Sequence, residues 1–138
     1  MKYHVAYLPP EKLRQDLLSA RQSFPGLGDK PLPIGVGFIC WMLDAKEELG
    51  KQIIDIALES NVRALWFSFG KDIFRWITYA RTSPAKKEQP LIFVQVTSVE
   101  EALLAANEWK ADVIVAQGPC LLSVLTRSRV HTDSCMTW

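Results

Sequence analysis

The sequence has few of the groups that build metal clusters, disulfide frameworks or nucleic-acid surfaces. Its three cysteines are odd in number and show no CxxC spacing, so neither disulfides nor a zinc cluster are expected. His131 and Cys135 lie four residues apart, but two ligands are too few for a closed zinc site, and no metal site is predicted. Sixteen basic and fifteen acidic residues give a formal net charge of +1, which gives no reason to expect a nucleic-acid partner.

Long apolar runs are also missing. No stretch approaches the roughly 18 apolar residues that cross a bilayer. The amino-terminal apolar run is too short for a secretory signal. We therefore expect a cytoplasmic protein with no membrane partner.

The residues that are present indicate an ordinary globular chain. A length of 138 residues favours one domain, and 49% hydrophobic with 22% charged residues is a globular composition. Four short runs, rich in β-branched and aromatic residues, are nearly continuously apolar: 34–39, 62–69, 91–96 and 112–117. This pattern predicts strands of a parallel sheet that is covered on both faces.

Helical patterns separate the four runs. Ser98, with a glutamate three residues later, predicts a capped helix start, and Asp44 with its own glutamate resembles the same box. Apolar residues at helical spacing predict a further helix over 71–81. Pro10 suits a first helical position, with Leu13 on the buried side.

Alternating strands and helices leave two architectures open, a doubly wound sheet or part of an eight-stranded βα barrel. The turn after residues 34–39 lacks the second and third glycines of a dinucleotide fingerprint. Periodicity does not separate the two architectures further.

Longer segments resemble the nitronate monooxygenases, formerly called 2-nitropropane dioxygenases. They are YLPPEKLRQDLLSAR, PIGVGFICWMLD, ALESNVRALWFSFG and IFVQVTSVEEALLAANEWKADVIVAQG, which together span roughly residues 7–118. The ordered pair VQVTSVEEA and DVIVAQG is the most specific part. The resemblance implies a barrel that binds flavin mononucleotide (FMN) and oxidises alkyl nitronates with molecular oxygen.

The resemblance also implies flavin contacts. Gln117 and Gly118 match the Ala-Gln-Gly of the family, which continues there as Glu-Ala-Gly-Gly-His-Gly and supplies the catalytic histidine. Here Pro119 follows, residues 119–138 contain no glycine, and no catalytic residue is predicted. Gln95 could face a ligand or make a structural hydrogen bond. Gly37 could contact flavin through its backbone or serve strand packing.

Aromatic and small residues near the strand ends complete the candidates. Trp41 is the tryptophan expected to face a ligand, whereas Trp66, Trp76 and Trp109 are expected in the core. Cys40 is interpreted as a buried small hydrophobe rather than a nucleophile. Two further residues could line a pocket or simply form a turn, Ser68 and Gly70.

The sequence thus predicts an α/β fold, a partial TIM-type (β/α) barrel of about four parallel strands over 1–118, followed by a divergent tail over 119–138. Its expected function is that of an FMN-dependent nitronate monooxygenase-like flavoprotein, with a nitronate and oxygen as small-molecule partners. One alternative is a truncated, non-catalytic relative that self-associates through an unfinished sheet edge. Another is a different FMN barrel oxidoreductase, such as an enoyl-acyl carrier protein reductase type.

Overall fold

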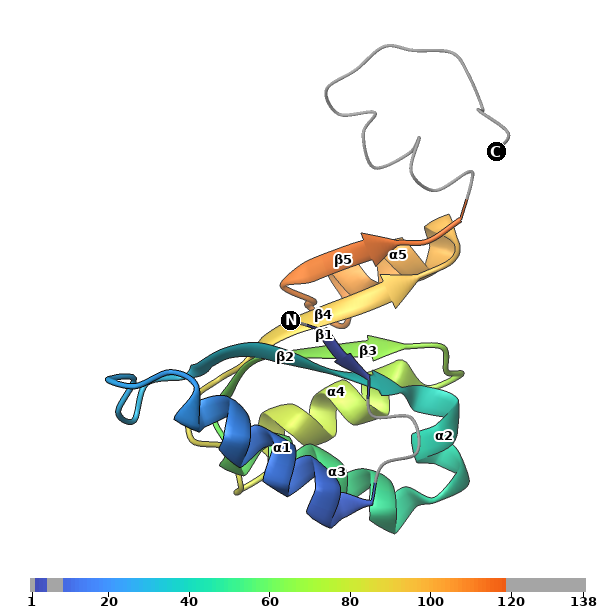
Figure 1. Cartoon of the computed structure of the whole chain (residues 1–138). Helices are drawn as coiled ribbons and strands as arrows, with labels where there is room; N and C mark the ends of the chain where they lie inside the picture. The colour runs from blue at the N-terminus through green and yellow to red at the C-terminus, as the bar shows by residue number, and fades with distance from the viewer. Residues whose placement is uncertain (1, 5–8, 119–138) are drawn as a thin grey trace.

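A parallel sheet organises the part of the chain that the computed structural model describes, residues 2–4 and 9–118 (Figure 1). Its five strands lie side by side in chain order, each parallel to the next. They are β1 (Lys2–His4), β2 (Leu32–Ile39), β3 (Val62–Ser68), β4 (Leu91–Val96) and β5 (Val113–Ala116). The helices are α1 (Pro10–Gln22), α2 (Cys40–Ala45), α3 (Glu47–Glu59), α4 (Ile73–Thr82) and α5 (Val99–Asn107).

The four predicted strands are confirmed, and one strand is added. The short β1 pairs with β2 through Lys2 and Gly35, and it precedes all four of the predicted runs. The sheet is open, and its order has none of the reversal that marks a doubly wound sheet. The predicted tail, 119–138, lies outside the described residues.

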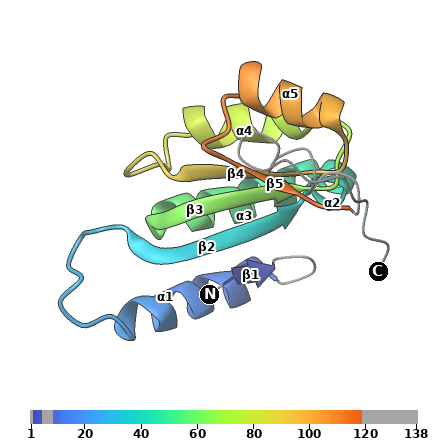
Figure 2. The same ribbon diagram turned by 90° about the horizontal axis from the view of Figure 1, so that it is seen from above.

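Helices cover one face of this sheet. Right-handed connections between strands taken in order place their helices on the same side. Figure 1 shows α1, α3 and α4 below β2 and β3, and Figures 1 and 2 show α5 alongside β4 and β5. The burial of β4 alternates accordingly: Ile92 and Val94 are fully buried, whereas Phe93 and Gln95 are half-buried. The prediction that both faces would be covered is therefore wrong within the described residues.

The core lies between the sheet and the helices. Phe38 of β2 and Phe67 of β3 stack with ring centroids 5.5 Å apart. Ile54 of α3 and Ile77 of α4 are fully buried against this layer. Leu13 of α1 is also fully buried, as the helical spacing predicts. The helices α1, α3 and α4 thus contribute the apolar faces that their sequence patterns indicate.

The helix starts divide into correct and wrong predictions. The Ser98 box is confirmed, because the Ser98 hydroxyl accepts from the Glu101 backbone N–H at 3.1 Å and the Glu101 carboxylate accepts from Thr97 N–H at 2.7 Å. The Asp44 box is wrong, since α3 begins after Lys46 without a side-chain cap. Asp44 lies in α2 and has partners on another helix.

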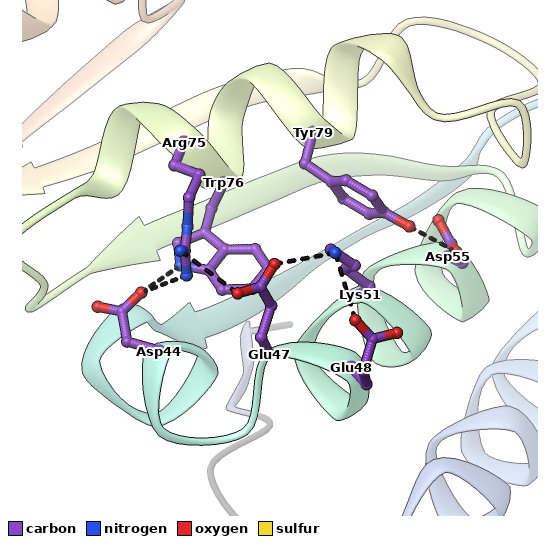
Figure 3. A network of polar contacts seen from close by, with 8 residues as sticks. All are labelled: Asp44, Glu47, Glu48, Lys51, Asp55, Arg75, Trp76 and Tyr79. Carbon is purple, nitrogen blue, oxygen red and sulfur yellow. Dashed lines mark hydrogen bonds and ion pairs between the residues drawn. The ribbon is translucent and has the colours of Figure 1, made fainter.

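Those partners belong to a polar network between α2, α3 and α4 (Figure 3). The Asp44 carboxylate accepts from the indole N–H of Trp76 at 2.8 Å and from Arg75 at 3.0 Å. Arg75 also pairs with Glu47 at 3.5 Å. An apolar core is not directional, so these contacts fix how α4 lies against α2 and α3.

The second half of the network centres on Asp55. Its carboxylate accepts from the Tyr79 hydroxyl at 2.8 Å and from the Ser83 hydroxyl at 2.7 Å. Burial raises the pKa of Tyr79 to about 12, and the bond to Asp55 adds to the shift. Both oxygens of the carboxylate are satisfied, so the cluster stabilises the helix layer.

Replacing Asp44 by alanine should lower the free energy of unfolding by about 1–3 kcal/mol, because the buried indole N–H of Trp76 loses its acceptor. Urea unfolding at neutral pH measures this. Glu48→Ala is the control, since the Glu48 side chain is 91% exposed and its ion pair among the described residues is with Lys51, so its loss should change stability by less than about 0.5 kcal/mol. Equal losses in both variants would contradict the role given to Asp44.

The stabilisation that the protonated Tyr79 provides should be lost at alkaline pH. The folded state holds the Tyr79 proton up to about pH 12, whereas the unfolded phenol releases it near its ordinary pKa of 10.0. The stabilisation is therefore present below pH 10 and is lost as the pH rises towards 12. Between pH 10 and 12, the unfolding free energy of Tyr79→Phe should fall less steeply than that of the wild-type protein. Cys40 titrates in both proteins, so the difference between the two curves reports on Tyr79. Parallel curves for the two proteins would contradict this account.

Candidate functional site

The candidate site lies on the face of the sheet that no described helix covers. Pairing aligns Gly37 of β2 with Trp66 of β3, and Trp66 with Phe93 of β4. Gln95, two residues beyond Phe93, points to the same face because side chains alternate along a strand. The side chains of the opposite parity, such as Phe67, are buried beneath the helices.

Three side chains on this face, Trp66, Gln95 and Gln117, form a hydrogen-bonded chain across β3, β4 and the end of β5. The indole N–H of Trp66 donates to Gln95 Oε1 at 3.2 Å. Gln95 Nε2 in turn donates to Gln117 Oε1. The backbone N–H of Gln117 donates to the Val96 carbonyl at 3.0 Å, which continues the β4–β5 pairing past the end of β5. Two glutamines that are 22 residues apart in the sequence are thereby brought into contact.

Two aromatic rings lie beside this hydrogen-bonded chain. Trp66 and Phe93 stack with centroids 5.6 Å apart and planes 17° apart. Both are half-buried, so the prediction that Trp66 belongs to the core is wrong: it lies on the uncovered face. Trp76 is 1% exposed and Trp109 packs partly buried against the core, as predicted. The uncovered face therefore carries two stacked aromatic rings next to two amides.

The two predicted glycines lie at different places. Gly118 directly follows Gln117 and has φ 128°, a conformation that residues with side chains rarely adopt. At the strand end it allows a backbone conformation that other residues resist, and its flavin contact stays a prediction. Gly37 is buried in the middle of β2, in the row of Trp66, and leaves no side chain over the uncovered face there.

The carboxyl ends of β2 and β3 are joined by one backbone hydrogen bond and one side-chain hydrogen bond. The Trp41 N–H donates to the Phe69 carbonyl at 2.9 Å, and the Ser68 hydroxyl donates to the Phe38 carbonyl at 3.2 Å. A Cβ added at Gly70 would collide with the Cβ of Cys40. Of the two turn or pocket candidates, Ser68 therefore bonds the two strand ends together and Gly70 allows their close approach.

Two aromatic side chains stand exposed at this junction. Trp41 is 53% exposed, and its role as the tryptophan that faces a ligand stays a prediction. Phe69 is 45% exposed and has φ 52°, an uncommon backbone conformation for a bulky residue. Sequence reasoning did not identify Phe69, because only the folded backbone reveals its conformation.

Cys40 is confirmed as a buried hydrophobe. It is fully buried, and burial raises the pKa of its thiol to about 12. The reactive form of cysteine is the thiolate, which this site does not hold near neutral pH. Cys40 therefore packs in the core, where burial disfavours its thiolate form.

Gly70→Ala should destabilise the junction by about 1–3 kcal/mol, because the new methyl group needs space that Cys40 occupies. Gly35→Ala is the control: its Cβ would lie 3.4 Å from the Cβ of Ala64, and a smaller unfolded-state entropy should leave stability unchanged or slightly raised. Thermal unfolding of both variants tests this. A stable Gly70→Ala protein would contradict the close approach.

Within residues 2–4 and 9–118, no group of three or more histidine, cysteine or acidic side chains could hold a metal ion. His131 and Cys135 lie outside that part of the chain. None of the helices described has the length and apolar character needed to cross a membrane. No family model matches the chain, and searches of curated proteins and solved structures gave no match.

Proposed function

We propose that this chain is an FMN-binding flavoprotein of the nitronate monooxygenase type, acting in the cytoplasm on alkyl nitronates with molecular oxygen. The observation that supports it is the contact between Gln95 and Gln117 at the carboxyl end of a parallel sheet. Active sites of βα barrels gather at that end of the strands. The resemblance implies that Gln117 contacts the flavin, and Gln95 was a candidate for either a ligand contact or a structural hydrogen bond. Their meeting on one face is what a shared ligand requires.

The proposal includes a partial (β/α) barrel of the TIM type. A sheet with strands in sequential order and its helices on one face has the arrangement of a barrel segment. Its uncovered face would then be the barrel interior. Five described strands are fewer than the eight of a closed TIM barrel, so closure is not part of the proposal.

The described residues fit the ring system of FMN. The stacked rings of Trp66 and Phe93 offer apolar contact to a ring system, and the amide of Gln117 can bond to a polar ring edge. The fit does not extend to the phosphate group. Pro119 has no N–H to offer where the family has a glycine-rich loop. When bound, FMN would accept electrons from the nitronate and pass them to oxygen.

The chemistry of the uncovered face favours a nitronate over a neutral nitroalkane. The side chains that form the candidate site are two amides and two aromatic rings, and none of the four titrates near neutral pH. A neutral nitroalkane needs a base to remove its proton, whereas a nitronate has already lost it. The residues would therefore bind and orient an anion rather than transfer a proton.

A second candidate function is that of a non-catalytic relative that binds another copy of itself. The observation that favours it is the pairing of β5, which among the described strands is bonded to β4 alone. An unpaired strand edge is a template for another chain. Self-association without flavin would support this candidate over the first.

Mixing the purified full chain with FMN and removing free cofactor should leave yellow protein. Gln117→Ala should weaken FMN binding about fivefold to tenfold, the loss of one hydrogen bond of about 1–1.5 kcal/mol. Equilibrium dialysis with flavin absorbance measures the affinity. Gln52→Ala, an exposed glutamine of α3 on the helical side, should leave it unchanged.

Oxygen consumption then distinguishes between the two types of FMN enzyme. Uptake with propane-2-nitronate supports the nitronate monooxygenase type, whereas bound FMN with reduction of an enoyl thioester would favour an enoyl-acyl carrier protein reductase type. A colourless chain that forms dimers by light scattering would overturn the flavoprotein proposal in favour of the second candidate.

A further inference from the structure

We propose that Trp66 is a positioning residue that sets the donor-to-acceptor direction of the hydrogen-bonded chain Trp66–Gln95–Gln117. The site thereby presents the N–H groups of Gln117 and selects a ligand with a hydrogen-bond acceptor oxygen. This deepens the function proposed above, on which the identity of the ligand rests. The direction of the chain itself can be tested without any ligand.

The direction follows from the chemistry of the indole. A glutamine amide can either donate or accept, but the indole nitrogen of Trp66 can only donate. Gln95 must therefore turn its oxygen to Trp66, which is the contact seen at 3.2 Å. Its NH2 group is then directed towards β5 and needs an acceptor.

The same reasoning passes to the next residue. Because Gln95 presents its NH2 group, Gln117 must turn its oxygen inward, which is the second contact of the chain. The NH2 group of Gln117 then points away from Gln95, and the side chain is exposed at the end of the strand. One donor-only ring thus fixes the orientation of two amides that would otherwise rotate freely.

Trp66 is itself held in place. Its ring stacks on Phe93, and its strand pairs with neighbours on both sides. A fixed donor at the start of the chain lowers the conformational freedom that the two glutamines would lose when a ligand binds. Hydrogen bonds in a row also polarise one another, which strengthens the donor at the far end.

An outward-facing donor selects acceptors. A ring carbonyl of FMN and the oxygens of a nitronate both have this chemistry. A ligand that offers an N–H group instead would leave the Gln117 donor unpaired, and such losses discriminate strongly in protein sites. Glutamate at position 117 would oppose an acceptor oxygen, because an ionised carboxylate can only accept.

Two variants test the direction through binding. Trp66→Phe keeps an aromatic ring beside Phe93 that can still contact the ligand but removes the indole N–H, and should weaken FMN binding about threefold to tenfold. Gln117→Glu should weaken it more than Gln117→Ala does. The matched control is Trp76→Phe, which removes an indole N–H on the helical side and should lower stability without changing FMN affinity.

Side-chain amide signals in NMR test the chain without FMN. In the wild-type protein, the NH2 protons of Gln95 should exchange more slowly with solvent than those of Gln117. Trp66→Phe should shift the NH2 signals of both glutamines, whereas Trp76→Phe should shift neither. Unchanged Gln95 and Gln117 signals in Trp66→Phe would overturn the inference, even if FMN binds.

Titration of the NH2 signals of Gln117 with FMN, and separately with propane-2-nitronate, identifies the source of the acceptor oxygen. A shift with either supports donor presentation and names the ligand. If the chain responds to Trp66→Phe but only the nitronate shifts Gln117, the flavin part of the proposed function fails while this inference stands. No shift with either ligand would overturn the selection of an acceptor oxygen.

Discussion

The register between β3 and β4 is the constraint on which the candidate site depends. Pairing Trp66 with Phe93 stacks the two rings and places Gln95 one step further along the same face. A slip of one residue would turn all of β4 over, since side chains alternate between faces. Ile92 and Val94 would then leave the core, so the burial of these two residues enforces the geometry of the polar face.

The fold could be predicted from the sequence wherever the signal is local. The run 91–96 gave the bounds of β4, and the Ser98 box gave the start of α5. Asp44 failed as a cap because its partner is the indole of Trp76, 32 residues away, and no local pattern contains that contact. β1 was missed because three residues carry too little periodicity to identify a strand.

The candidate site could be predicted in its members but not in its connections. Gln95 and Gln117 were both identified, yet their contact depends on strand register, and Trp66 was assigned to the core because its sequence neighbours are apolar. Apolar runs are typical of strands buried on both faces, and the same composition also suits an aromatic surface on an uncovered face. Only the arrangement of the helices distinguishes the two cases.

The close approach of Gly70 to Cys40 has a consequence for related sequences. The two positions lie in different βα units, yet a side chain at one occupies the space that a side chain at the other would need. Relatives that keep this junction should therefore vary at the two positions in concert: glycine at 70 wherever 40 carries a side chain, and a larger residue at 70 only where 40 has become glycine. Such a pattern of paired substitution would follow from steric exclusion alone, independently of any ligand.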